Sequence, residues 1–561
     1  MIFDEADGIF EFLRGTLPYY TIAVVPIIIM VSVTPVLGAH EFTVYRMQQF
    51  DLQGAPHGCR NSIINVEART LNTATYNRKC IVARLSELSQ THYQEVIQQG
   101  AAGLLILLPS NISSLSAEQQ QHIMELERTL LEEEVNIPIY FTQETPEMEE
   151  IYNSVQKSPN NERAGTAAEE LIGSVTTSGF QMVISGSSPK PQTDVQIASI
   201  QGKLPGFGVE EQLPTVALVA HYDAFGIAPA LSFGADSNGS GVAALLELAR
   251  LLSHLYTSSR THPRFNLLFL LSGGGKFNYQ GSKKWIEDNI DSSEGSLLPD
   301  SLYTLCLDTI GTDDSLYLHV SKPPKDGSPG SFLYKELQNV ANWLYPEMNV
   351  SMVHKKINLA EEVLAWEHER FSIRRLPAFT LSRLHVPKLL SRMSILDTRD
   401  KVDVDKLARN VKIIAEALAR HMYNLSGTFK AEIFSDGLAV QKQFLTAWID
   451  YLSSNSRSAQ LLASISPRHP LVTTLEQTMA RYLKEVRTSI FKPDRREPEV
   501  VFYEPAIAMM NAYRVKPAVF DLFLAVAIAI YLSIVYFIIM NFYRVESFLR
   551  QLASPVKSKQ T

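Results

Sequence analysis

The chain has 561 residues, a formal net charge of −8 and an acidic pI near 6.0. This charge gives no electrostatic reason to expect nucleic-acid binding, and the length allows more than one domain with a large core. The three cysteines are too few for a disulfide-stapled scaffold, although they permit one bridge. Cys59 and Cys80 are the candidates for it, while Cys306 falls in a buried strand.

An uncharged apolar segment lies close to the N-terminus. Residues 17–39 end in small residues, as a signal peptide cleaved near Ala39 does. The residues before this segment are acidic apart from Arg14, which is atypical of a signal peptide, so a retained signal anchor is the alternative. We expect residues 1–39 to be a signal peptide.

Residues 40–160 alternate between strand and helix patterns. We expect strands at 104–108 and 137–141 and helices at 91–100 and 117–134. Together they indicate a small βαβ unit. The prediction is an N-terminal region with an α/β accessory lobe that resembles the apical or protease-associated lobes found beside some peptidase domains.

The main domain is expected over residues 161–427. Strand patterns occur at 216–220, 265–271, 303–307, 316–320 and 377–381, with helical patterns between them. The run FNLLFLL at 265–271 is apolar throughout, as in a strand buried on both faces of a sheet. A long amphipathic helix over about 407–422 closes the domain. We therefore expect an α/β fold, a three-layer sandwich with a mixed sheet covered by helices on both faces.

The character of the chain changes after residue 427. Helical patterns at 444–452 and 471–490 predict a helical juxtamembrane region over 428–516, which would form a stalk or a packing layer before the membrane. Residues 519–540 are apolar except for Asp521, and about 20 such residues suffice for a helix to cross a bilayer. We expect a transmembrane helix at 517–541.

The charges that follow this segment predict its orientation. The tail at 542–561 carries Arg544, Arg550, Lys557 and Lys559, and basic residues beside a span mark the cytosolic side. The bulk of a single-pass type I protein would then be lumenal. Four glycosylation sequons that precede the span agree with this placement: Asn111, Asn238, Asn349 and Asn424.

The most informative stretch is a strand that ends in His221-Tyr222-Asp223, followed by a helix start that reads GADSNGSG at 234–241. In α/β sheets, ligands bind at the carboxyl ends of strands. The stretch resembles the first metal-binding block of the M28 family of zinc aminopeptidases. The resemblance implies that His221 matches a metal ligand, that Asp223 matches the carboxylate orienting it, and that Asp308, in CLDTIG at 306–311, matches another ligand.

At other positions of the family pattern this sequence lacks the side chains that would bind metal or activate water. The shared carboxylate falls on Ser237, next to Asp236, and a hydroxyl cannot bridge two cations. The paired glutamates, one a general base, fall on Gly275 and Lys276. The segment 391–398 offers no histidine where the family has its last ligand. We therefore expect no metal, no other cofactor and no catalytic residue.

Two hypotheses follow for the remaining polar residues. Lys276 would neutralise the inherited carboxylates, with its ammonium within hydrogen-bond reach of Asp308 or Asp236. A glycan on Asn238 would obstruct the vestigial pocket, unless the loop folds first and leaves that sequon empty.

Over nearly its full length the chain resembles the nicalin family of nicastrin-like proteins. The resemblance rests on strings such as HEFTVYRMQQFDLQG at 40–54, SGGGKFNYQGS at 272–282 and MNAYRVKPAVFDL at 510–522. It implies a type I protein of the endoplasmic reticulum membrane with a non-catalytic lumenal domain. It also implies association with Nodal modulator, transmembrane protein 147 and the translocon in multipass membrane-protein biogenesis, and a link to Nodal signalling. A scaffold subunit is the expected function, and a lumenal zinc aminopeptidase-like hydrolase with an atypical metal shell is the alternative.

Overall fold

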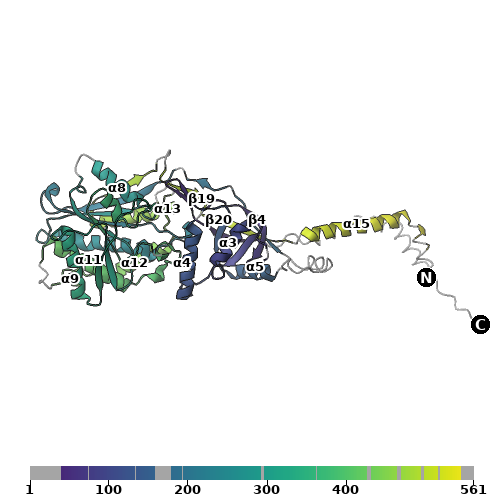
Figure 1. Cartoon of the computed structure of the whole chain (residues 1–561), viewed down its shortest axis with the longest axis horizontal. Helices are drawn as coiled ribbons and strands as arrows, with labels where there is room; N and C mark the ends of the chain where they lie inside the picture. The colour runs from purple at the N-terminus through teal and green to yellow at the C-terminus, as the bar shows by residue number, and fades with distance from the viewer. Residues whose placement is uncertain are drawn as a thin grey trace, which may run out of the picture.

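The computed structural model describes residues 39–541 apart from 74, 133, 158–178, 187, 193, 292–295, 362, 389, 426–430, 464–468, 494–497 and 516–517, and also residues 543, 544 and 547. The expected signal peptide at 1–39 and the expected cytosolic tail at 542–561 lie almost entirely outside these residues. Figure 1 shows a large α/β domain, a smaller barrel domain beside it, and helix α15 (Ala518–Met540) after the barrel.

The large domain is built on an eight-stranded mixed sheet with the strand order β16-β15-β17-β14-β12-β13-β11-β18. The central strands β13, β12, β14 and β17 are parallel to one another. At one side β11 is antiparallel to both of its neighbours, β13 and β18, and at the other side β15 is antiparallel to β17. The strand bounds are β11 Ile197–Leu204, β12 Thr215–His221, β13 Asn266–Ser272, β14 Ser301–Leu307, β15 Ser315–Val320, β16 Asn349–His354, β17 Ala378–Ser382 and β18 Lys484–Phe491.

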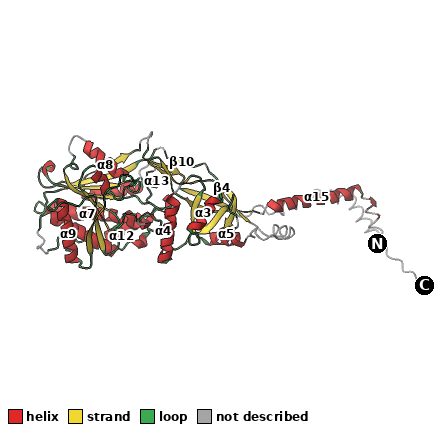
Figure 2. Ribbon diagram, in the orientation of Figure 1, coloured by secondary structure: helices red, strands yellow, loops and turns green. Residues whose placement is uncertain are grey.

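Helices cover both faces of this sheet, as Figure 2 shows. On one face pack α7 (Gly241–Thr257), α9 (Pro329–Leu344), α11 (Val404–Met422), α12 (Lys442–Ser454) and α14 (Pro470–Tyr482). On the other pack α8 (Gln280–Asp291) and α10 (His368–Ile373). Within β12, Val216 and Leu218 face the first layer and Val219 faces the second, as period-two alternation requires. The predicted three-layer arrangement of the main domain is present.

The smaller domain is a closed barrel with the order β1-β20-β9-β4-β5-β6-β8. Its strands are β1 Ala39–Arg46, β4 Ile64–Thr70, β5 Cys80–Arg84, β6 Gly103–Leu108, β8 Ile139–Gln143, β9 Gly179–Ile184 and β20 Ile507–Val515. Helices α3 (Gln90–Gln98), α4 (Ala117–Glu132) and α5 (Pro146–Lys157) pack around it. The expected helices and strands of the accessory lobe exist, but the lobe also recruits β9 and β20 from distant parts of the chain.

A third, five-stranded sheet lies outside both units, with the order β10-β19-β2-β3-β7. Its strands are β2 Gln49–Leu52, β3 Ala55–Cys59, β7 Glu134–Val135, β10 Lys190–Pro191 and β19 Val500–Glu504. Phe50 and Phe502 from this sheet pack edge-on against Phe277 of the large domain, with ring centroids 5.2 and 4.8 Å apart. These aromatic contacts join the sheet to the large domain.

The helical patterns predicted at 444–452 and from 471 are present as α12 and α14, and these helices form the packing layer of the prediction, whereas the stalk alternative is wrong. After α12 and α14 this region forms β18, β19 and β20, which join three different sheets. The cause is visible in β20, where Met510 and Ala512 are buried while Met509 is exposed, an alternation typical of a strand. The helix expected over 471–490 ends at Tyr482, and the residues that follow form β18 from Lys484 instead.

Helix α15 coincides with the segment predicted to cross a membrane. Among the residues that the structure describes, no helix meets the length and apolar character required of a membrane span.

The three cysteines are buried free thiols. Cys59 and Cys80 belong to different apolar clusters, and the Cys59 thiol instead donates to the carbonyl oxygens of Asn61 and Ile137, each at 3.1 Å. The candidate bridge between Cys59 and Cys80 is therefore absent.

Candidate functional site

The fold brings the sequence-predicted positions together at one edge of the large sheet. Strands β12, β13, β14 and β17 are mutually parallel, so their carboxyl ends meet there. His221 ends β12, Asp308 follows β14, and Lys276 lies in the turn after β13. Asp236 and Ser237 lie in η4 (Ala235–Ser240), just before α7.

Asp223 bonds to the backbone of the turn that follows β13. Its two carboxylate oxygens accept hydrogen bonds from the backbone N–H groups of Gly275 (2.7 Å) and Lys276 (3.0 Å). These bonds fix the turn after β13, so Asp223 does not act on His221 as the family resemblance implied.

Asp308 forms a buried ion pair with Arg392. The Arg392 guanidinium also donates to the hydroxyl oxygen of Tyr279 (2.9 Å) and to the carbonyl of Ala365 (2.9 Å), and it stacks 4.2 Å from the centre of the Trp366 ring. Burial alone would raise the pKa of the Asp308 carboxyl, but Arg392, with smaller contributions from His221 and Lys276, holds that pKa well below its usual range. Asp308 is thus a permanently charged partner of a permanently charged arginine.

Asp236 is paired in the same way with a different arginine. Its Oδ2 accepts from Nε of Arg383 at 2.7 Å, and its Oδ1 accepts from the backbone N–H of Gly311 at 2.8 Å. Arg383 also contacts Asp313 at 2.7 Å. Both carboxylates at potential ligand positions are therefore occupied by guanidinium groups.

The Lys276 ammonium points into the site but contacts neither carboxylate that we expected. Its Nζ donates to the Ser237 hydroxyl at 2.6 Å and to the carbonyl oxygen of Arg392 at 3.3 Å. Burial and the nearby Arg392 charge lower the pKa of Lys276 to about 8. Two of the positions at which this chain departs from the metal pattern, 237 and 276, therefore bond to each other, while arginines pair with the carboxylates.

His221 contacts a glutamate that sequence reasoning missed. Its Nδ1 lies 3.3 Å from Oε2 of Glu367, and Glu367 also accepts from the hydroxyls of Ser272 (2.6 Å) and Ser282. His221 and Glu367 are both completely buried. A signal was available, because Glu367 stands beside His368 in the segment WEHERF, but the sequence does not reveal that this segment reaches β12.

Asp397 is a second missed residue. Its carboxylate oxygens accept from the backbone N–H groups of Asp236 (2.9 Å) and Ser237 (2.8 Å), so it fixes the start of η4. Burial, and then repulsion from Asp236, raise the pKa of Asp397 to about 6. The segment that lacks the family's last histidine thus supplies Arg392 and Asp397, both with structural roles.

The side chain of Asn238 is fully buried and fully bonded. Its nitrogen donates to the carbonyls of His221 (3.1 Å) and Leu307 (2.8 Å), and its oxygen accepts from the N–H groups of Gly241 and Thr309. The prediction of a glycan on Asn238 does not agree with this packing, because the nitrogen that would carry the sugar lies in the core. Asn111, Asn349 and Asn424 are exposed.

We tested whether the residues present could hold the zinc that the M28 pattern implies. A Cβ added at Gly275 would lie 2.4 Å from Cβ and Cγ of His221, so the backbone leaves no room for a glutamate there. Asp236 and Asp308 are committed to arginines. The described residues contain no group of three or more His, Cys, Asp or Glu side chains that could hold a metal ion. The donor set does not fit a zinc site.

Comparisons with known proteins agree with this fold. Residues 197–351 match Peptidase family M28. The structure is similar to the crystal structure of the gamma-secretase component nicastrin, with a TM-score of 0.55 and 12% sequence identity, covering 84% of this chain and 99% of the chain in that structure.

Curated relatives cover almost the whole chain. It is 48% identical to BOS complex subunit ncln of Danio rerio, over 99% of each chain, and 48% identical to BOS complex subunit NCLN of Homo sapiens, over 96% of this chain and 97% of that one. It is 31% identical to nicalin of Caenorhabditis elegans, over 89% of this chain and 90% of that one. With full-length identity at this level, the chain belongs to the nicalin family.

Proposed function

We propose that this chain is a non-catalytic scaffold subunit of a membrane complex. The observation that carries the proposal is the buried Arg392–Asp308 ion pair, with the Lys276 ammonium bonded to Ser237 beside it. Fixed cationic side chains stand where a hydrolase of this architecture would need divalent cations. Position 275 offers no base, and a lost base alone costs about 10²–10⁴-fold in rate.

The names of the relatives support the kind of assembly. Those from Danio rerio and Homo sapiens are named as subunits of the BOS complex, and we assign the same role to this chain. From the family resemblance, its partners are Nodal modulator and transmembrane protein 147. The complex would act with the translocon in multipass membrane-protein biogenesis at the endoplasmic reticulum, with a link to Nodal signalling.

The surface of α15 supports a membrane anchor. Apolar side chains on several sides of this helix are exposed, among them Val526 and Ile530 on one side and Ile528 and Leu532 on the opposite side. The Ser533 hydroxyl in this helix donates to the carbonyl of Ala529 at 2.8 Å and so needs no partner outside the helix. We propose that α15 crosses the membrane, with the barrel and the large domain in the lumen.

Affinity purification of the full chain in mild detergent tests the scaffold role. Lys276→Met removes the site's ammonium without adding volume, and the scaffold proposal predicts that this variant retains the membrane partners at the wild-type ratio. Replacement of residues 517–541 by an unrelated apolar span should reduce recovery of those partners. Loss of partners from Lys276→Met, with unchanged thermal unfolding, would contradict a role independent of the site.

A further inference from the structure

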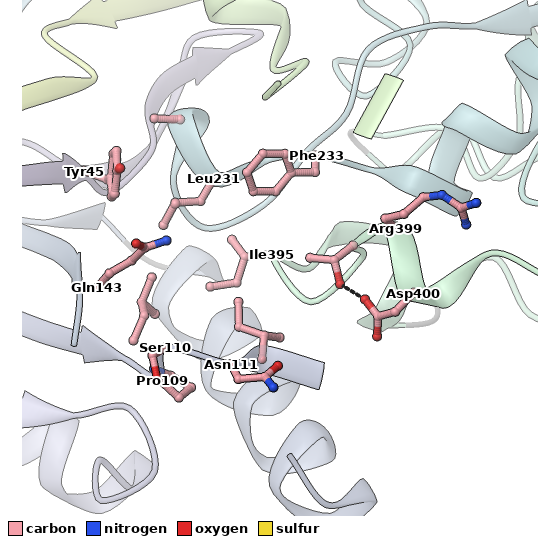
Figure 3. Close-up of a pocket in the computed structure, with 14 residues that line it drawn as sticks. Tyr45, Pro109, Ser110, Asn111, Gln143, Leu231, Phe233, Ile395, Arg399 and Asp400 are labelled. Atoms are coloured by element: carbon pink, nitrogen blue, oxygen red, sulfur yellow. Dashed lines mark hydrogen bonds between the residues drawn. The ribbon is translucent and has the colours of Figure 1, made fainter. Parts of the chain in front are cut away.

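A cleft of about 480 Å³ lies between the barrel and the large domain, and its lining includes neither Lys276 nor Asp308 of the candidate site (Figure 3). On the barrel side it is lined by Tyr45, Gln143 and the loop Leu108–Ile112, which leaves the carboxyl end of β6. On the other side it is lined by Leu231, Phe233, Ile395 and Asp400 of the large domain. Its volume falls within the ~300–1,000 Å³ typical of small-molecule sites, which occur preferentially between domains.

The two walls of this cleft are held at a fixed separation by α4. Glu127 on α4 is buried, and its carboxylate accepts from the backbone N–H of Ile395 (3.0 Å) and from the hydroxyl of Ser394. Further along α4, Gln120 accepts from the ammonium of Lys401 at 2.9 Å. The cleft is therefore built into the contact between the domains, so an occupant would find it preformed.

One residue that lines the cleft belongs to a sequon for N-linked glycosylation. Asn111 belongs to the sequon Asn111-Ile112-Ser113 and is exposed at the side of the cleft. Its carbonyl accepts from the hydroxyl of Ser114 at 2.8 Å, which fixes the backbone of the turn η1 (Ile112–Ser114) on which it stands. A sugar on Asn111 would be tethered at the cleft, and a short tether gives a high effective concentration.

The lining suits a sugar. Tyr45 and Phe233 offer aromatic surfaces for the apolar face of a pyranose ring, and Figure 3 shows them on either side of Leu231. The Gln143 amide can donate and accept hydrogen bonds, and the Asp400 carboxylate can accept them from hydroxyls. Asp400 already accepts from Thr398, which holds it in position.

We propose that Asn111 carries an N-linked glycan whose first N-acetylglucosamine residues lie in this cleft and brace the barrel against the large domain. The proposal rests on the lumenal placement given under the proposed function, since N-glycans are added in the lumen. It separates Asn111 from Asn349 and Asn424, which are exposed but do not line the cleft.

The test uses the full chain expressed in eukaryotic cells and purified in mild detergent. Site occupancy is read by mass spectrometry after deglycosylation in heavy-oxygen water, and the rate of enzymatic glycan release is compared between native and denatured protein. We expect Asn111 to be occupied, with native release about tenfold slower than from Asn424 because the core sugars are covered. Denaturation should remove that difference. Ala230→Trp, which narrows the cleft, should restore fast native release at Asn111.

The other outcomes separate the two proposals. An empty Asn111 beside an occupied Asn349 or Asn424 would overturn the cleft glycan and leave the lumenal placement standing. Equal native release at Asn111 and Asn424 would also overturn it. If no sequon is occupied, the lumenal placement fails, and this inference fails with it.

Discussion

Arg392 and Asp308 form an ion pair in the interior, although 84 positions separate them along the chain. Arg392 is 9% exposed, and its Nη2 donates to Asp308 and Tyr279 while its Nη1 donates to the carbonyl of Ala365. The pair closes the carboxyl ends of β12 and β14 with protein charges. The candidate site is thereby part of the core.

Removal of one member of this pair should be costly. Arg392→Leu leaves the Asp308 carboxylate buried without its counter-ion, and breaking a buried pair costs about 3–5 kcal/mol. We expect a loss of this size in the free energy of unfolding, measured by urea denaturation. Lys335→Ala, which breaks an exposed pair with Asp326 at 3.8 Å, should cost less than about 1 kcal/mol. Comparable losses in the two variants would mean that Arg392 is not an internal counter-ion.

Gly275 should resist reversal to the family pattern. Because an added Cβ meets the His221 side chain at 2.4 Å, Gly275→Ala should lower stability by about 1–3 kcal/mol, and Gly275→Glu by more. Gly186→Ala is the matched control, since nothing lies within 4 Å of a Cβ built there. Thermal unfolding of the three variants checks this. A stable Gly275→Glu variant that binds stoichiometric zinc would show that the site can be rebuilt.

The contact between α4 and the large domain should depend on pH. Burial raises the pKa of Glu127 to about 7, against an unfolded value near 4.5, although hydrogen bonds from Ile395 and Ser394 oppose the shift. The folded state therefore binds more protons than the unfolded state between these values. Glu127's contribution to stability is full below about pH 4.5 and falls as the pH rises towards 7, by about 1–3 kcal/mol in total.

Glu127→Gln keeps the shape and removes the titration. We expect the variant to gain thermal stability relative to wild type between pH 5 and pH 7.5. Glu125→Gln, an exposed residue on the same helix, should leave the pH profile unchanged. Parallel pH profiles for wild type and Glu127→Gln would refute the assignment.

Helix α15 should tolerate little charge if it is a membrane anchor. Ile530→Arg together with Ile534→Arg should oppose insertion by about 5–7 kcal/mol, because an arginine at the centre of a span costs about 2.5–3.5 kcal/mol. The readout is the fraction of the chain that resists alkaline carbonate extraction. Tyr543→Arg, beyond the helix, is the control. Full resistance in the double variant would argue against an anchor at α15.

The sequence revealed the large domain because its signals are local. The apolar runs at 216–220 and 265–271 and the amphipathic pattern of α11 each report on one element. The barrel could not be recognised, because it closes only when β20 pairs with β1 and β9, and Met510 finds its partner Phe42 across more than four hundred residues. Nothing near residue 510 indicates that pairing.

The candidate site, too, was only partly predictable from the sequence. His221, Asp223, Asp236 and Asp308 could be placed from their motifs, and so could the substitutions at Ser237, Gly275 and Lys276. The hydrogen-bond and ion-pair partners of these residues could not be predicted. Arg383, Arg392 and Asp397 come from later segments with no motif of their own, and the motif around Glu367 does not reveal its contact with His221. Which arginine pairs with which carboxylate depends on tertiary packing.

The central claim is that side-chain cations have replaced metal chemistry in this fold. Its most direct test is the zinc content of the full chain, purified in mild detergent after growth with added zinc and measured by mass spectrometry against protein concentration. The account predicts far less than one zinc per chain, with the same value for His221→Ala. One or two zinc ions per chain in the wild type, lost in His221→Ala, would contradict it.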